Sequence, residues 1–168
     1  MVVFYTKHQG KIVCLAKGVR RPTSRKRASI ELFTQANIGG VAHGPMNIVT
    51  ETVIVNSFSN IRQDYARVGA AYRVGEIIDR LTAENSETEG VYSLIVETLR
   101  GIEICDISLL NKVVENFTGH LLVLLGFWPA GKTLPEGASL FSFVEDVIEK
   151  NLNSDRYFNN KTTRSEGV

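Results

Sequence analysis

The hydrophobic pattern along the chain changes its period near residue 57. Before that point, short β-branched and aromatic runs alternate with turns rich in Gly and Pro, which is typical of β-strands. This pattern predicts strands at 2–6, 11–17, 30–37 and 48–55. Two loops are expected within this part: Lys7-His8-Gln9-Gly10, as the turn of a first hairpin, and the irregular stretch from Gly39-Gly40 to His43-Gly44-Pro45. Short strands separated in this way favour a small barrel or sandwich.

From Ser57 onward, apolar residues recur at steps of three to five, which indicates amphipathic helices. We expect helices at about 60–83, 92–101, 107–126 and 139–152, followed by a polar tail. Within the third helix, His120 is expected to pack in the core with Phe117 and Leu124. The order of elements therefore predicts an α+β fold, with a β domain at 1–57 and an all-helical domain at 58–168.

Composition places the chain among ordinary globular proteins. It has 168 residues, and its hydrophobic content of 43% is enough for a buried core. The longest apolar run, which extends from Leu121 to Trp128, is too short to span a membrane, and the N-terminus lacks the pattern of a signal peptide. Cys14 and Cys105 are expected to be reduced and buried, as in a cytoplasmic protein.

Charge is distributed unevenly along the chain. The stretch Lys17–Arg27, called the basic segment below, contains Lys17, Arg20, Arg21, Arg25, Lys26 and Arg27. Lys7 and Lys11 precede it, and no Asp or Glu occurs before Glu31, although the formal net charge of the whole chain is only +1. Gly18 and Pro22 place these cations on a loop rather than a helix. Such an asymmetry indicates a polyanionic partner, while a solvated mobile loop and a nuclear-localisation tract share the same composition.

Candidate catalytic and metal-binding motifs are weak in this sequence. His8, His43 and His120 do not share metal-ligand spacing, and two cysteines cannot form a four-ligand zinc site. The acidic cluster Glu145, Asp146 and Glu149 is expected to face water. The stretch 126–133 fits the bare phosphate-loop pattern, but it follows a helix instead of a strand, and Pro129 removes one backbone amide. We therefore expect no catalytic residue, no metal and no cofactor, and hence a protein that is not an enzyme.

The cations suit contact with nucleic-acid backbones. Lys and Arg neutralise phosphates and release counterions without reading the base sequence. Phe4, Tyr5 and Phe33 could stack on bases, but their positions at strand centres favour a place in the core. The predicted DNA-binding residues are Lys7, Lys11, Lys17, Arg20, Arg21, Arg25, Lys26 and Arg27.

Several stretches resemble the bacterial DNA repair and recombination protein family RecO. The two most specific are 4–12, Phe-Tyr-Thr-Lys-His-Gln-Gly-Lys-Ile, and 16–24, Ala-Lys-Gly-Val-Arg-Arg-Pro-Thr-Ser. Further stretches agree with the family in order, namely Leu32-Phe33-Thr34, Ser57-Phe58, Ile77–Leu81, Leu124–Phe127 and Asp146–Phe158. The resemblance therefore covers nearly the whole chain.

The resemblance implies an OB-fold barrel followed by a helical domain. It also implies binding of single- and double-stranded DNA and annealing of complementary strands in recombinational repair of DNA damage. The implied partners are a RecR-type protein, the single-strand-binding protein and the RecA recombinase, which the family helps to load. The implied location is the nucleoid of the bacterial cytoplasm, and the implied DNA-binding residues are Lys17, Arg20, Arg21 and the cluster 25–27.

The sequence departs from the family pattern in two places. Family members usually begin with a further extended strand, and four strands are one fewer than a five-stranded OB barrel needs. Either the barrel is open, or the chain is truncated or divergent, and a first strand is missing or supplied by another chain. Many members also carry a four-cysteine zinc module, whereas the loop 128–138 holds no cysteine, so this chain is identified as a short member that lacks the zinc module.

Two alternatives fit the residues as well. In the first, the chain is a protein-interaction adaptor whose basic segment binds an acidic peptide. In the second, it is an RNA-binding OB-like module, because phosphate contacts alone do not separate RNA from DNA.

Overall fold

The computed structural model describes the chain except for residues 19–27, 45, 130, 132–138, 149–151 and 153–168. The chain divides into two compact units, a β unit and a helical unit. The β unit consists of the described part of Met1–Ser59 together with Ala83–Glu87. The helical unit consists of Asn60–Thr82 and the described residues from Thr88 onward. The predicted α+β class, with an OB-like unit before a helical one, is confirmed.

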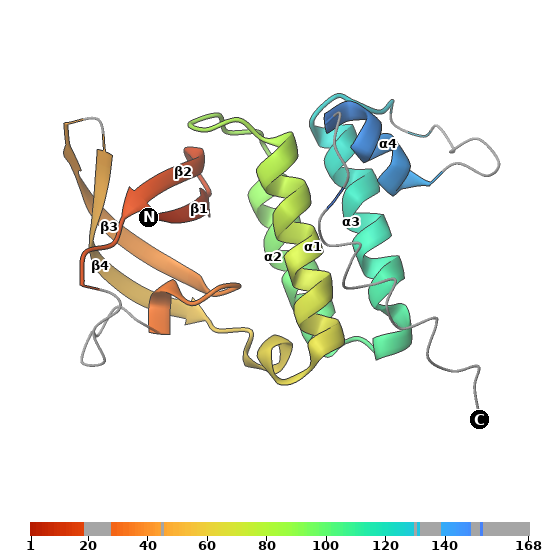
Figure 1. Ribbon diagram of the computed structural model, residues 1–168, viewed down its shortest axis with the longest axis horizontal. Coiled ribbons are helices and arrows are strands. Elements are labelled where there is room, and N and C mark those ends of the chain that lie inside the picture. Colours follow the sequence, from red (N-terminus) through yellow and green to blue (C-terminus); the bar gives the residue numbers. More distant parts are fainter. Residues whose placement is uncertain (19–27, 45, 130, 132–138, 149–151, 153–168) are drawn as a thin grey trace. The chain divides into compact units, whose positions relative to one another are not determined.

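The β unit is a four-stranded mixed sheet (Figure 1). Its strands are β1 (Val2–Thr6), β2 (Gly10–Leu15), β3 (Gln35–His43) and β4 (Met46–Asn56), in the order β1-β2-β4-β3. The β1–β2 and β3–β4 pairs are antiparallel hairpins. The two hairpins are joined by parallel pairing of β2 with β4, through Cys14 opposite Asn47 and Leu15 opposite Ile48. One sheet therefore carries both ends of the basic segment.

The third strand differs from its sequence-based prediction. It begins at Gln35, while Ala28–Ile30 forms the 3-10 helix η1 and Phe33 adopts a φ of +59°. Gly39-Gly40, expected in a loop, lies inside β3 at a shift in its register with β4. A Cβ at Gly40 would lie 3.0 Å from the carbonyl oxygen of Ile48. The glycine pair therefore accommodates a bulge instead of ending the strand.

The core of the β unit is small. Its buried residues are Ile12, Cys14 and Val49, and Phe4, Ile30 and Ile38 pack against them. These side chains come from all four strands and η1, so the apolar contact ties the hairpins and η1 together. Phe4 is thus a core residue, as its position at the strand centre predicts.

A later segment, Ala83–Glu87, lies in sequence between α1 (Tyr65–Leu81) and α2 (Val91–Ile104) and also belongs to the β unit. Glu84 forms a parallel bridge with Lys11, and the amide of Asn85 donates to the Lys11 carbonyl at 2.8 Å. Gly10 lies beside this contact with a φ of +63°, and a Cβ there would lie only 2.0 Å from the Ser86 carbonyl oxygen. Only glycine fits at position 10. Residues with a Cβ disfavour this positive φ, and the Ser86 carbonyl oxygen belongs to the backbone and cannot move aside to make room for a Cβ.

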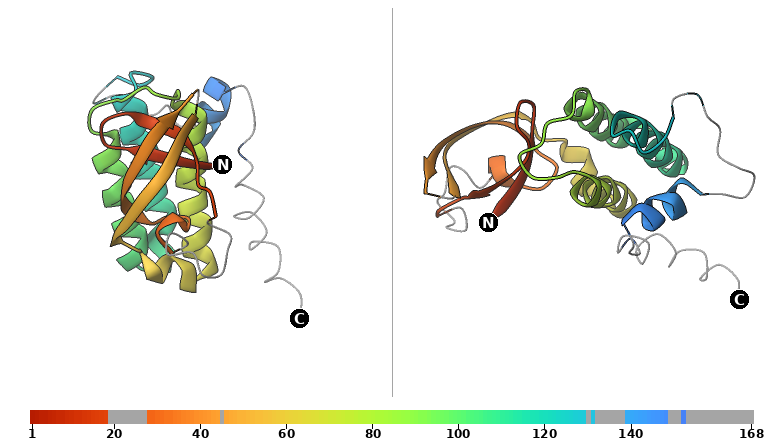
Figure 2. Two further views of the ribbon diagram at one scale, coloured as in Figure 1. Left: turned by 90° about the vertical axis from the view of Figure 1, so that its left-hand side faces the viewer. Right: turned by 90° about the horizontal axis from the view of Figure 1, so that it is seen from above.

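The helical unit contains four α-helices (Figure 1). They are α1 (Tyr65–Leu81), preceded by the 3-10 helix η2 (Ser59–Gln63), α2 (Val91–Ile104), α3 (Leu110–Leu124), preceded by η3 (Ile107–Leu109), and α4 (Leu140–Ile148). Figures 1 and 2 show α1, α2 and α3 packed side by side. Gly101, the predicted end of the second helix, lies within α2, where a Cβ would approach the Val113 side chain at 3.6 Å. No helix in the described part of the chain is long and apolar enough to cross a bilayer.

Polar contacts fix the beginning of α1 against the end of α2. The Asp64 carboxylate caps α1 by accepting from the amides of Ala66 and Arg67, at 2.8 and 3.1 Å. The Arg67 guanidinium donates to the carbonyls of Ile102 and Cys105, which lie at the C-terminus of α2. A cation at this end also complements the helix dipole. His120, predicted in the core, is exposed on α3 instead, because Phe117, Leu121 and Leu122 form the buried face.

Gly10→Ala should destabilise the β unit, whereas Gly18→Ala should serve as its matched control. Both glycines have a positive φ, but no atom lies within 4 Å of a Cβ built on Gly18. We expect a loss of about 1 kcal/mol for Gly18→Ala and about 2–4 kcal/mol for Gly10→Ala, since only the latter adds a steric clash. Native-state hydrogen exchange of the β2 amides measures the difference. Equal losses for the two variants would contradict the close contact with Ser86.

Candidate nucleic-acid interface

The basic segment lies in sequence between two elements, β2 and η1, that both contact the strand β4. At its start, it follows β2, which pairs with β4 through Leu15 and Ile48. At its end, it leads into η1, which contacts β4 and β3. Ser29 is buried within η1, and Ile30 packs against the core of the β unit. The segment therefore spans two fixed points on one sheet, although its residues 19–27 lie outside the described part of the chain.

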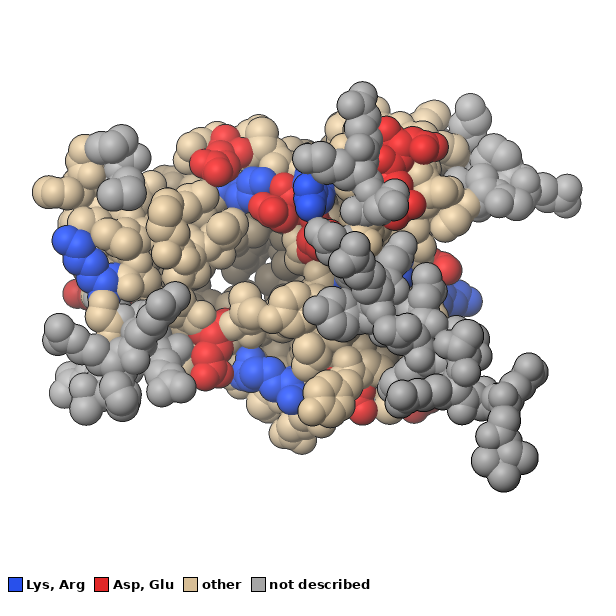
Figure 3. Space-filling view, in the orientation of Figure 1, with Lys and Arg blue, Asp and Glu red and all other residues tan. Residues whose placement is uncertain are grey.

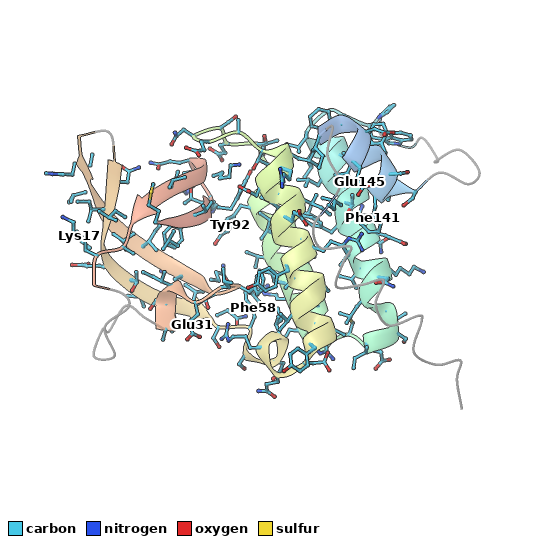
Figure 4. The ribbon with its side chains drawn as sticks, in the orientation of Figure 1. Lys17, Glu31, Phe58, Tyr92, Phe141 and Glu145 are labelled. Atoms are coloured by element: carbon cyan, nitrogen blue, oxygen red, sulfur yellow. The ribbon has the colours of Figure 1, made fainter. Side chains whose placement is uncertain are left out.

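The structure places three of the eight predicted DNA-binding residues. Lys17 is exposed just beyond β2, where Figure 4 labels it, and Lys7 is exposed in the β1–β2 turn. These two lie beyond opposite ends of β2, roughly 20 Å apart at about 3.3 Å per residue. Lys11 has only 9% of its surface exposed, because the 83–87 segment lies beside it. Lys11 is therefore too buried to contribute to a DNA-binding surface on the β unit.

The other five predicted residues belong to the basic segment. Arg20, Arg21, Arg25, Lys26 and Arg27 lie outside the described residues, so their role stays a prediction. In the sequence, they lie between β2 and η1, and both of these elements contact β4. The candidate interface is therefore defined by β2 and η1 and by the cations in the sequence between them.

The β unit displays aliphatic rather than aromatic side chains. Phe4 is directed to the core, and Tyr5 and Phe33 are half-buried. The exposed large apolar side chains of its described residues are Met1, Val3, Leu32, Val41, Val53, Ile54 and Val55. Bases stack on aromatic faces, so the described surface favours contacts with phosphates over contacts with bases.

Elsewhere, positive and negative side chains are mixed. On the face shown in Figure 3, the described Lys and Arg lie next to Asp and Glu instead of forming a patch of their own. The whole sequence after residue 30 also carries more Asp and Glu than Lys and Arg. Neighbouring carboxylates weaken the field that a polyanion experiences. The basic segment is therefore the best candidate for phosphate contacts.

The helical unit contains a buried cation that serves its own packing. Arg73 on α1 is 7% exposed, and its guanidinium carbon lies 4.0 Å from the centroid of the Phe141 ring on α4. Burial lowers the pKa of Arg73, while the negative charges of Glu145, Glu76 and Glu115 act in the opposite direction. The aromatic face and these carboxylates offset the loss of water, so Arg73 fastens α4 to α1.

Glu145 has a different environment from the one expected. It was predicted to face water, but it is half-buried, and its carboxylate accepts from the Leu152 amide at 2.9 Å. Figure 4 labels Glu145 and Phe141 on α4. Asp146 is exposed, as predicted. Glu145 therefore helps to hold the helical unit together. This structural contact does not support a role for Glu145 as a catalytic acid or base.

Within the described ranges, no three His, Cys, Asp or Glu side chains gather as metal ligands would. The two cysteines are free thiols with different surroundings. Cys14 is buried in the core of the β unit, and Cys105 is half-buried at the end of α2. Burial raises the pKa of the Cys14 thiol, so a smaller fraction of it is the reactive thiolate.

Comparison with known protein families gives two matches along the chain. Residues 1–58 match the family described as "Recombination protein O N terminal", and residues 62–132 match "Recombination protein O C terminal". The boundary between the matches falls between β4 and α1. The two matches occur in the same order as the β unit and the helical unit.

Three curated relatives illustrate the similarity, each named "DNA repair protein RecO". The relative from Roseiflexus sp. (strain RS-1) is 31% identical over 80% of this chain and 50% of its own length. That from Pelotomaculum thermopropionicum is 29% identical over 77% of this chain and 49% of its own. That from Symbiobacterium thermophilum is 30% identical over 77% of this chain and 51% of its own. The chain spans about half the length of the curated relatives that it matches.

The two cysteines should react with a disulfide reagent at different rates. At pH 8, we expect Cys14 to react at least roughly tenfold more slowly than Cys105, since its raised pKa and its burial both limit attack. Raising the pH through the pKa of Cys14 should speed the slow phase by increasing its thiolate fraction. Stopped-flow absorbance with Cys14→Ser and Cys105→Ser assigns each phase. A fast phase that survives in Cys105→Ser would refute the burial of Cys14.

Proposed function

Since the chain belongs to the RecO family of DNA repair proteins, we propose that it binds the sugar-phosphate backbone of DNA through its basic segment. The observation that carries the proposal is that the elements before and after that segment, β2 and η1, both contact one strand, β4, of an OB-like sheet. A loop with fixed ends loses less conformational entropy on binding than a tail would. This difference in entropy supports the basic segment as the place where DNA binds.

The expected mode of binding is largely independent of sequence. Lys and Arg that contact phosphates release counterions, and the described part of the β unit has no exposed Phe, Tyr or Trp ring for base stacking. If all six cations of the segment contact single-stranded phosphates, the logarithm of affinity should fall with the logarithm of salt at a slope of about −4. The proposal therefore includes both single- and double-stranded DNA as ligands.

We extend the proposal to annealing of complementary strands in recombinational repair. Annealing needs two phosphate backbones to be neutralised and held close together, which requires cations and no catalytic residue. The protein would accordingly act as a mediator and not as an enzyme. Family membership is also what supports the proposed partners: a RecR-type protein, the single-strand-binding protein and RecA, within the bacterial nucleoid.

Removing three cations from the basic segment should weaken DNA binding. We expect the joint change of Arg25, Lys26 and Arg27 to Ala to lower affinity for a single-stranded oligonucleotide at least tenfold at moderate salt. It should also make the salt slope shallower by about 2, since each lost contact contributes about 0.7. Adding Arg20→Ala and Arg21→Ala should abolish binding. Fluorescence anisotropy across a salt series measures both effects.

A matched control removes the same charge from the helical unit. Arg80, Arg100 and Lys112 are exposed there, and their joint change to Ala should leave both the affinity and the slope nearly unchanged. Equal losses in the two triple variants would show that net charge, and not the basic segment, attracts DNA. Salt-matched titrations with RNA of the same length, and competition by an acidic peptide, test the RNA-binding and adaptor alternatives.

Strand annealing should depend on the same cations. The protein should accelerate the pairing of two complementary oligonucleotides, one with a fluorophore and the other with a quencher, and the acceleration should decline at high salt. The triple variant at 25–27 should lose most of it, whereas the helical-unit control should retain it. Normal DNA binding without any acceleration would contradict the annealing role while leaving the binding proposal intact.

A further inference from the structure

The segment Ala83–Glu87, called the strap below, lies against β2 through a small and specific contact. Glu84 forms a parallel bridge with Lys11, and the amide of Asn85 donates to the Lys11 carbonyl at 2.8 Å. A Cβ on Gly10 would lie only 2.0 Å from a carbonyl oxygen of the strap. The strap is therefore fitted to one place on β2.

Other features of the strap make this contact easy to break. All five of its residues are exposed, and its pairing with β2 is a single bridge and not a ladder. Asn85 has a φ of +56°, which residues with a Cβ disfavour. Segments with few buried contacts and an exposed backbone open locally while the rest of a domain stays folded. The strap has these properties.

The strap lies over the one cation of β2. This cation, Lys11, has only 9% of its surface exposed. Ile12 and Cys14 belong to the core of the β unit, so Lys11 lies on the opposite face of the strand. Lys7 precedes β2 and Lys17 follows it, and both are exposed. An uncovered Lys11 would therefore stand between two exposed cations along the strand.

We propose that the strap is an autoinhibitory cover, whose release exposes Lys11 to DNA and whose return removes that contact. The inference rests on the proposed function, because it adds a phosphate contact to those of the basic segment. Glu84 and Glu87 on the strap are exposed, and their carboxylates weaken the field that a polyanion experiences near β2. Release therefore uncovers one positive charge and moves two negative charges away from it.

DNA and the strap then compete for Lys11. The open form binds DNA more tightly by one contact, so DNA shifts the strap toward the open form by the same factor. One contact with a single-stranded phosphate steepens the salt slope by about 0.7, which amounts to roughly fivefold in affinity between 1 M and 0.1 M salt. The unmodified protein shows less than this gain, because only its open fraction offers the contact.

Asn85→Pro in the whole chain tests the proposal by releasing the strap. Proline has no amide to donate to Lys11, and its φ of about −65° conflicts with the positive φ at this position. We expect affinity for single-stranded DNA at 0.1 M salt to rise about threefold and the salt slope to steepen by about 0.7. Asn85→Gly is the matched control, because it keeps the amide and suits the positive φ. Its affinity should not exceed that of the unmodified protein in fluorescence anisotropy.

Lys11→Met identifies the cation that the strap covers. Alone, it should change DNA affinity by less than about twofold, because Lys11 is covered in most molecules. Combined with Asn85→Pro, it should remove the gain, so that the two substitutions are not additive. A gain that persists in the double variant would overturn the proposal, and so would equal affinities of Asn85→Pro and Asn85→Gly.

A protease that cleaves after Glu reports on the strap directly. Cleavage after Glu87 should be faster in Asn85→Pro than in Asn85→Gly, and single-stranded DNA should accelerate it in the unmodified protein. Equal cleavage of the two variants, or no acceleration by DNA, would contradict the proposal. Circular dichroism should show unchanged helices, because residue 85 lies outside α1 and α2.

The same titrations separate this proposal from the one on which it rests. If Asn85→Pro accelerates cleavage but leaves DNA affinity unchanged, Lys11 is not a DNA contact and the strap is not inhibitory. The loss of affinity in the triple variant at 25–27 would still support the basic segment as the DNA-binding site. Normal binding by that triple variant would instead contradict the proposed function itself.

Discussion

The parallel contact between β2 and β4 is the constraint on which the rest of the β unit depends. Among the described residues, it consists of the pairs Cys14–Asn47 and Leu15–Ile48, and it unites two hairpins that would be marginal alone. Cys14 and Val49 are buried next to it. Because the chain leaves β2 here and returns through η1 to the same sheet, the contact also fixes the ends of the basic segment.

Local sequence predicted the elements whose stability is local. The β-branched and aromatic runs located β1 and β2, and the spacing of apolar residues located α1 and α3. The third strand was misplaced because Leu32-Phe33 was interpreted as its centre, whereas Phe33 has a positive φ and the strand begins at Gln35. Gly39-Gly40 suggested a loop, but pairing with β4 absorbs both glycines at a bulge. The bounds of β3 are set by its pairing with β4. A local stretch of sequence does not reveal such pairing, because the paired residues are distant along the chain.

The candidate site shows the same division. The concentration of cations at 17–27 is visible in the sequence, because Lys and Arg are recognised without knowledge of their contacts. The burial of Lys11 is not visible, because the segment that lies beside it comes more than 70 residues later, around Glu84. Nor does the sequence reveal that Arg73 packs against the Phe141 ring. Arg62 and Arg80, which are exposed, occur in the same kind of mixed charged and apolar sequence. The packing of Ile30 against the core likewise depends on contacts made across the sheet.

The central proposal is that the basic segment, which joins two elements of an OB-like sheet, binds the phosphates of DNA. The most direct test is a nuclear magnetic resonance titration of the isotope-labelled chain with a single-stranded oligonucleotide of mixed sequence. The account predicts that amide shifts change chiefly between Lys17 and Glu31, with the amides of α1 to α4 nearly unaffected. Changes confined to the helices, with the signals of residues 17–31 unmoved, would contradict it.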